Sequence, residues 1–124
     1  ACRESYGRMC IEMEYARIDD PAEVRRLASF SPYHLVRDGV RYPAVFMDAG
    51  ATDPRCPPWH ARKFAARLQR ASGSNEPILL HVWESVGHGW ATKQDVAVEE
   101  HTEWLAFTLR HLRLEWPTTN LRSE

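Results

Sequence analysis

The sequence of 124 residues lacks several features that would define its class at once. No stretch approaches the ~18 consecutive apolar residues of a membrane-spanning helix, and no apolar segment follows the first residues as it would in a signal peptide. The 16 lysine and arginine residues nearly balance the 17 aspartate and glutamate residues. No strong field is therefore available to attract nucleic acid or an anionic membrane, and we expect neither as a partner.

Cysteine is also scarce, with only Cys2, Cys10 and Cys56. An odd number at irregular spacing does not indicate a disulfide framework, and no C-x-x-C pair indicates a structural zinc site. The histidines show no ligand spacing either, so we expect no metal. Free thiols favour a reducing compartment, which predicts a cytoplasmic location. The chain lacks an initial methionine, which suggests that it begins within a longer protein.

What the sequence does contain is an alternation of helical and extended patterns. Asp20, Pro21 and Glu23 predict the start of a helix that ends at Ser31-Pro32. Apolar runs predict strands at 42–47 and 77–83. The first of these is apolar without alternation, which indicates a strand that is covered on both faces. Periodic patterns predict helices from Pro57-Pro58 to Gly73 and from a Thr92 cap to Trp116-Pro117. Residues 1–18 show no clear periodicity, residues 33–40 lead into a turn, and residues 117–124 are expected to form a disordered tail.

This order of elements predicts an α/β fold. Two parallel strands joined by a crossover helix form one βαβ unit, followed here by a last helix. Such a unit leaves both strand edges unpaired. We therefore expect residues 1–124 to be the end of a larger sheet that the rest of the same domain completes.

Two polar residues follow the two predicted strands. Asp53 lies in the loop 48–60 after the first strand, and His88 lies between Gly87 and Gly89 after the second. Ligands and catalytic groups of α/β sheets gather at the carboxyl ends of the strands. An acid after one strand and a histidine after the next is the order of the last two members of a Ser…Asp…His triad. Both side chains can meet, because the loops leave the same end of neighbouring strands.

Other interpretations of these residues stay open at this point. Asp53 before a proline is a turn signal, His88 can be an idle loop residue, and Asp48 is a competing acid at the predicted strand end. The chain also shows no nucleophile. Ser5 and Ser85 each lack the glycine two positions earlier that the G-x-S-x-G elbow requires, and Ser85 follows Asp53 instead of preceding it.

The combination of motifs resembles the end of the catalytic domain of the prolyl oligopeptidases, a family of serine peptidases. The resemblance extends from about residue 7 to about residue 112. The stretches that carry it are Phe30-Ser31-Pro32-Tyr33-His34, Val40-Arg41-Tyr42-Pro43-Ala44, Gly50-Ala51-Thr52-Asp53-Pro54-Arg55, Pro58-Trp59-His60-Ala61-Arg62-Lys63 and Gly87-His88-Gly89.

By this resemblance, Asp53 matches the acid and His88 the base of the family's catalytic triad. Arg55 matches an arginine that hydrogen-bonds a substrate carbonyl, a role that suits its fixed fork of donors. Two positions depart from the family pattern: Pro54 stands where a second aspartate is common, and Cys56 stands where valine is common. The nucleophile, the oxyanion-stabilising donors and the proline pocket lie upstream in the family and are absent from these residues.

The resemblance therefore implies a C-terminal segment of an α/β-hydrolase domain, with the nucleophile-bearing half absent. The complete enzyme is expected to cleave peptide substrates after proline through a Ser–Asp–His triad, without a cofactor. The partners implied are a peptide substrate and the remainder of its own catalytic domain. Two alternatives remain: a truncated, non-catalytic module that binds a partner through its sheet edge, and a part of another α/β-hydrolase such as an esterase or acyl-peptidase.

Overall fold

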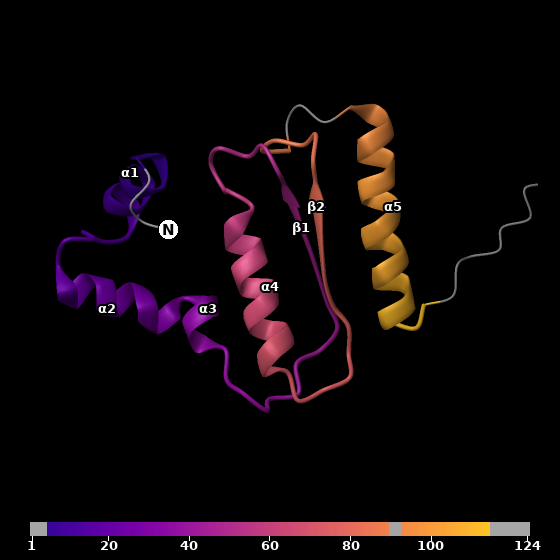
Figure 1. The fold of residues 1–124 in the computed structure, drawn as a ribbon, viewed down its shortest axis with the longest axis horizontal. Helices are drawn as coiled ribbons and strands as arrows, with labels where there is room; N and C mark the ends of the chain where they lie inside the picture. The colour runs from indigo at the N-terminus through magenta and orange to yellow at the C-terminus, as the bar shows by residue number, and fades with distance from the viewer. Residues whose placement is uncertain (1–4, 90–92, 115–124) are drawn as a thin grey trace, which may run out of the picture. The chain divides into compact units, whose positions relative to one another are not determined.

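The computed structural model describes residues 5–89 and 93–114, with side chains from Arg8 onward (Figure 1). The chain divides into two compact units, residues 1–92 and residues 93–124. The first unit holds six described elements: α1 (Ser5–Glu14), α2 (Pro21–Phe30), α3 (Pro32–Leu35), β1 (Val45–Gly50), α4 (Trp59–Ala71) and β2 (Ile78–Trp83). The second holds α5 (Gln94–His111).

The predicted βαβ unit is present. β1 and β2 pair in parallel, with Val45 opposite Ile78 and Gly50 opposite Trp83. The crossover helix α4 packs against both strands, and α3 contacts α4 (Figure 1). Because the two strands run in register to their last residues, the loops that follow them start side by side. The α/β fold class predicted from the sequence is confirmed.

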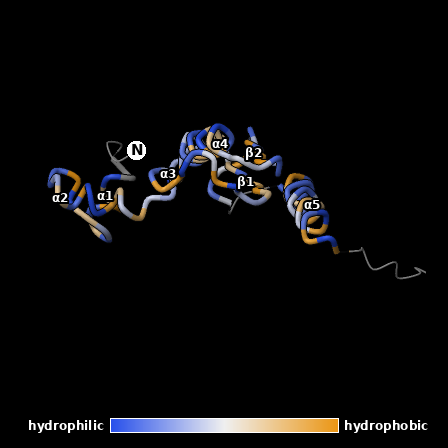
Figure 2. The backbone as a smooth tube through the Cα atoms, turned by 90° about the horizontal axis from the view of Figure 1, so that it is seen from below, coloured by the Kyte–Doolittle hydropathy of each residue, from blue (hydrophilic) through white to orange (hydrophobic). Residues whose placement is uncertain are grey.

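The core of the first unit lies between α4 and the sheet. Leu68 and Ala71 of α4 and Ile78 of β2 are buried, together with Val36 after α3. α4 carries both hydrophilic and hydrophobic residues (Figure 2). Its buried residues, Ala65, Leu68 and Ala71, recur every three positions and form one apolar face. Four partly buried side chains complete this cluster: Tyr42, Val45, Met47 and Phe64.

The predicted helix start at Asp20 is confirmed. Its carboxylate accepts the backbone N–H of Ala22 at 2.8 Å, and Pro21 occupies the first helical position. Glu23 does not complete the expected capping box, because its carboxylate accepts the backbone N–H of Arg17 instead. The helix ends at Phe30, directly before Ser31-Pro32, as predicted.

Several boundaries differ from the prediction. Residues 5–14 form α1 and residues 32–35 form α3, where no helix was predicted. The first strand begins at Val45 instead of Tyr42, because the Tyr42 N–H bonds the Val40 carbonyl at 3.0 Å within a turn. β1 continues to Gly50, because each of its residues pairs with a residue of β2 as far as the last pair, Gly50 and Trp83. Asp48 therefore lies inside β1 and not at its end.

The expected cover on both faces of the first strand is partial in the described residues, where Val45, Phe46 and Met47 are half-buried. Leu79 in β2 is 47% exposed, and Asp48 in β1 is exposed as well. Part of the sheet thus presents apolar side chains to the outside. This is the pattern of a sheet that further elements would complete.

In the second unit, α5 begins at Gln94 with Lys93 at the N-cap position and no side-chain cap. The predicted Thr92 cap lies outside the described residues, as does the tail 117–124. The helix ends at His111, earlier than the predicted Trp116-Pro117. Its acidic first turn and basic last turn match the helix dipole. None of the described helices is both long and apolar enough to span a membrane.

The central position of α4 in this core can be tested at Leu68, which is 4% exposed. We expect Leu68→Ala to lower the free energy of unfolding by ~2–5 kcal/mol, since it removes buried methyl groups and leaves a cavity. Met13→Ala is the matched control, because Met13 is 79% exposed. Urea denaturation midpoints measure both; equal shifts in the two variants would contradict this core.

Candidate active site

The candidate site lies where the two strands end. Gly50 and Trp83 are the last residues of β1 and β2 and stand opposite each other. Asp53 follows three residues after the first of these ends, and His88 follows five residues after the second. The register of the sheet therefore delivers both loops to one place.

Backbone hydrogen bonds tie the two loops together. The Ala51 N–H donates to the Trp83 carbonyl at 2.9 Å, and the Thr52 N–H donates to the Val86 carbonyl at 3.1 Å. The Thr52 hydroxyl donates to the same Val86 oxygen at 2.9 Å. These bonds join the two loops at residues that directly precede Asp53 and His88 in the chain. The distance between the Asp53 and His88 side chains is therefore set by the backbone as well as by their own contact.

Gly50 makes this close approach possible. It is buried, and a Cβ atom there would overlap the backbone carbonyls of Val86 and Gly87. Gly87 and Gly89 flank His88 in the second loop. In the structure Gly89 has the positive φ of 78° that favours glycine, whereas Gly87 does not lie in that region.

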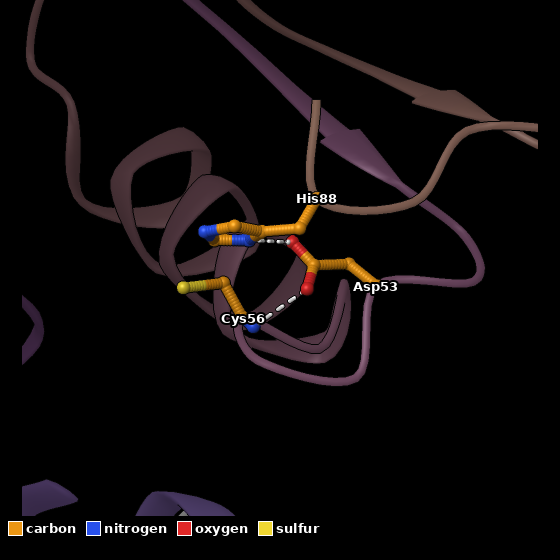
Figure 3. Close-up of side chains that lie close together, drawn as sticks. All are labelled: Asp53, Cys56 and His88. Atoms are coloured by element: carbon orange, nitrogen blue, oxygen red, sulfur yellow. Dashed lines mark hydrogen bonds and ion pairs between the residues drawn. The ribbon is translucent and has the colours of Figure 1, made fainter. Parts of the chain in front are cut away.

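The side chains of Asp53 and His88 meet as expected (Figure 3). Oδ2 of Asp53 lies 2.8 Å from Nδ1 of His88, and the other oxygen, Oδ1, accepts the backbone N–H groups of Arg55 and Cys56 at 2.8 and 2.9 Å. The Asp53 side chain is only 9% exposed and the His88 side chain 38%. Three donors thus hold a carboxylate that is largely withdrawn from water.

These contacts set the charge of Asp53. Burial by itself raises the pKa of a carboxyl group. At Asp53 the hydrogen bonds from Cys56, His88 and Arg55 outweigh burial, and its pKa lies below the ordinary value. The ionised form therefore stabilises the fold. This contribution is complete above the ordinary pKa and is lost as the pH falls through the lowered one.

An ionised Asp53 also determines which ring nitrogen of His88 carries the proton in the neutral form. A carboxylate can only accept hydrogen bonds, so Nδ1 of His88 must be the donor in this contact. In neutral His88 the second ring nitrogen, Nε2, is then left as an acceptor. Among the described residues it has no hydrogen-bond partner. This arrangement can withdraw a proton from a group placed against Nε2.

The other candidates from the sequence do not join this pair. Asp48 is exposed within β1, and Ser85 has no described hydrogen bond to His88. Ser5 begins α1 instead of standing on a strand-to-helix turn. Arg55 is exposed, and its guanidinium has no hydrogen bond or ion pair to any part of the chain that the structure describes. It is therefore available to a ligand.

The structure adds three residues that sequence reasoning missed: Gly50, Thr52 and Cys56. Gly50 and Thr52 act through contacts with the loop 84–89, more than thirty positions away, which no local pattern reveals. The Cys56 thiol has ligand-type atoms of Asp53 and His88 within 4.8 Å. The only signal in the sequence was its unusual place beside Arg55, where the resemblance led us to expect valine.

The role of Gly50 in holding His88 against Asp53 can be tested through the pKa of Asp53. We expect Gly50→Ala to displace the His88 loop, weaken the donor contact and raise the pKa of Asp53 towards its ordinary value. Titration of the carboxyl carbon by ¹³C NMR measures this. Gly87→Ala is the control, since a Cβ there meets only Oγ1 of Thr52, at 3.9 Å. An unchanged pKa in Gly50→Ala would refute the role.

Known proteins are similar to this chain in sequence and in fold. The profile of the prolyl oligopeptidase family matches residues 6–115. A prolyl endopeptidase of Elizabethkingia miricola is 30% identical over 103 residues, which cover 82% of this chain and 15% of that protein. An uncharacterized peptidase of Sinorhizobium fredii is 49% identical over 90 residues, or 73% of this chain and 11% of that protein.

Solved structures agree. A prolyl endopeptidase structure superposes with a TM-score of 0.81 at 38% identity and covers 88% of this chain and 16% of that one. Oligopeptidase B of Leishmania major gives a TM-score of 0.72 at 27% identity, over 78% of this chain and 13% of that one. The chain thus spans about 15% of the length of the curated prolyl endopeptidase that it matches. On the length of the profile match and the similarity of the fold, this chain belongs to the prolyl oligopeptidase family.

Proposed function

We propose that Asp53 and His88 are the acid and the base of a serine peptidase triad that hydrolyses peptide bonds after proline. The observation that carries this proposal is the 2.8 Å contact between Oδ2 of Asp53 and Nδ1 of His88. A nearly buried carboxylate with a lowered pKa on one side of the imidazole leaves the other nitrogen to act as the base. Membership of the prolyl oligopeptidase family supports the same chemistry.

The proposed reaction uses His88 twice. A serine hydroxyl against Nε2 gives its proton to His88 as it attacks the substrate carbonyl, and the imidazolium then passes that proton to the leaving amine. Asp53 keeps Nδ1 protonated and stabilises the positive charge that forms on the ring. It can do so because its three donors keep it ionised before the reaction starts.

The serine itself is proposed to come from a part of the catalytic domain outside this chain. In this proposal residues 1–124 form the C-terminal segment of that domain. Two observations support it: the chain matches about 15% of the length of a prolyl endopeptidase, and the sheet has only two strands in the described residues, with Leu79 47% exposed. Further strands pairing with β1 or β2 would complete the sheet.

The roles of both residues can be tested in the complete protein that contains this chain. We expect Asp53→Asn to lower kcat by about 10⁴-fold, because an amide cannot hold the tautomer that the reaction needs, and His88→Ala to lower it at least as much. Asp48→Asn is the matched control, since Asp48 is an exposed acid in the preceding strand. Hydrolysis of a fluorogenic peptide measures kcat.

Near-normal turnover in either site variant would exclude the triad assignment. A fall as large in Asp48→Asn would show that loss of folding, and not of chemistry, explains the result. The same assay tests the preference for proline. The proposal predicts that a peptide with proline before the reporter is hydrolysed faster than one with alanine there, and the opposite order would point to a different peptidase specificity.

Arg55 is proposed to donate to a carbonyl of the bound peptide. Its backbone N–H is fixed by Oδ1 of Asp53, while its side chain is exposed and has no partner among the described residues. A hydrogen bond from a charged donor contributes about 1.5–3 kcal/mol. We expect Arg55→Ala to lower kcat/KM by ~10–100-fold, and Arg55→Lys to recover little, since an ammonium lacks the planar fork.

Steady-state kinetics of the complete protein measure the effect of these Arg55 variants. Arg62→Ala is the matched control, because Arg62 is an exposed arginine on α4. Full recovery by lysine would indicate that the charge alone matters. An unchanged kcat/KM in Arg55→Ala would remove Arg55 from the substrate site.

A further inference from the structure

The Cys56 side chain has no role in the proposed triad, although it lies beside it. Cys56 contributes only its backbone N–H, which donates to Oδ1 of Asp53 at 2.9 Å. Its thiol is exposed and forms no disulfide. Figure 3 shows the sulfur on the side of the imidazole ring that faces away from Asp53, where the second ring nitrogen also lies. The thiol therefore adjoins the nitrogen that the reaction would use.

Asp53, Cys56 and His88 together offer three atoms of the kind that bind metals. One carboxylate oxygen, the thiol sulfur and one imidazole nitrogen all lie within 4.8 Å of one another. Around a tetrahedral zinc ion such atoms stand roughly 3.5 Å apart, from bond lengths of about 2.0–2.3 Å. Because Cys56 and His88 are exposed, rotation of their side chains can close the remaining distance without moving the strands.

The chemistry of this set favours one class of ion. Thiolate and imidazole are ligands of zinc and of softer divalent metals, whereas magnesium and calcium prefer sites made of oxygen atoms alone. Three protein ligands leave a fourth position open to water, so the site would be reversible and accessible from solvent. The two backbone N–H groups that hold Oδ1 of Asp53 also orient this carboxylate towards the other two ligands.

We propose that Asp53, Cys56 and His88 form a zinc site that inhibits the enzyme. Binding displaces the thiol proton to solvent. Zinc takes the place of the proton on Nδ1 of His88, which moves to Nε2, so that Oδ2 of Asp53, 2.8 Å from Nδ1, can bind the same ion. While zinc is bound, His88 cannot accept the proton of a nucleophile. The metal site itself follows from the geometry alone, whereas the inhibition rests on the proposed function, in which His88 is the base.

The experiment uses the complete protein that contains this chain, with Zn²⁺ as the probe and Mg²⁺ as the hard-cation comparison. Competition with a chromophoric chelator measures zinc affinity in wild type, Cys56→Val and Cys10→Val. Cys10 is the matched control, because it is a free, half-buried cysteine in α1 outside the ligand cluster. Loss of a residue that only hydrogen-bonds to a metal ligand already lowers metal affinity ~10–100-fold. We therefore expect Cys56→Val to weaken zinc binding by at least about ten-fold, and Cys10→Val to leave it unchanged.

Peptide hydrolysis with and without zinc, compared within each variant, tests the inhibition. Wild type and Cys10→Val should lose activity at zinc concentrations at least about ten-fold lower than Cys56→Val requires, and Mg²⁺ should inhibit none of them. Equal zinc affinity in wild type and Cys56→Val would overturn the metal site. Cys56-dependent binding without inhibition would overturn the inhibitory role.

The two proposals fail in different ways. A protein that binds zinc through Cys56 but hydrolyses no peptide would contradict the proposed function and leave the metal site in place. An active peptidase whose zinc affinity does not depend on Cys56 would contradict the metal site and leave the proposed function in place.

Discussion

The hydrogen bond between Asp53 and His88 depends on one constraint, the parallel register of β1 and β2. The strands end opposite each other at Gly50 and Trp83, so the loops that follow start from the same edge. A shift of the register by one residue would turn every side chain of a strand to the other face and separate the loop ends. The core between α4 and the sheet therefore also serves the site, because it holds this register.

The loops convert that register into a fixed geometry. Thr52 bonds the Val86 carbonyl twice, and the absence of a side chain at Gly50 lets the His88 loop lie directly on the end of β1. A carboxylate withdrawn from water is costly unless it is hydrogen-bonded. Asp53 meets this condition with two backbone donors and one imidazole donor, and its pKa stays low despite burial. The two backbone donors thus fix the carboxylate, and the carboxylate in turn orients His88.

The sequence predicted the parts of this arrangement that depend on local patterns. The strand, helix, strand order and the two polar loops followed from apolar runs and from glycine and proline positions. Two helices were missed, α1 because its apolar residues show no clear period and α3 because it has only four residues. The β1 boundaries were displaced because pairing with β2, and not propensity, decides where the strand starts and stops.

The site was predictable to a similar extent. Asp53 and His88 could be placed together because neighbouring parallel strands bring their carboxyl ends to one edge. The supporting contacts of Gly50 and Thr52, and the thiol of Cys56, join residues about thirty or more positions apart. Nothing in the local sequence marks such contacts. Cys56 and His88 form no recognisable ligand spacing, so spacing rules predict no metal there, and only the fold brings their ligand-type atoms within 4.8 Å of each other.

The most direct test of the central claim is the protonation state of His88. ¹⁵N NMR of the histidine-labelled protein, with His88 assigned from the His88→Gln variant, distinguishes the two neutral tautomers by the shifts of the ring nitrogens. The account predicts that neutral His88 carries its proton on Nδ1, donated to Asp53, and that Nε2 is unprotonated. A neutral His88 with its proton on Nε2 would show that Asp53 does not hold the ring, and would contradict the account.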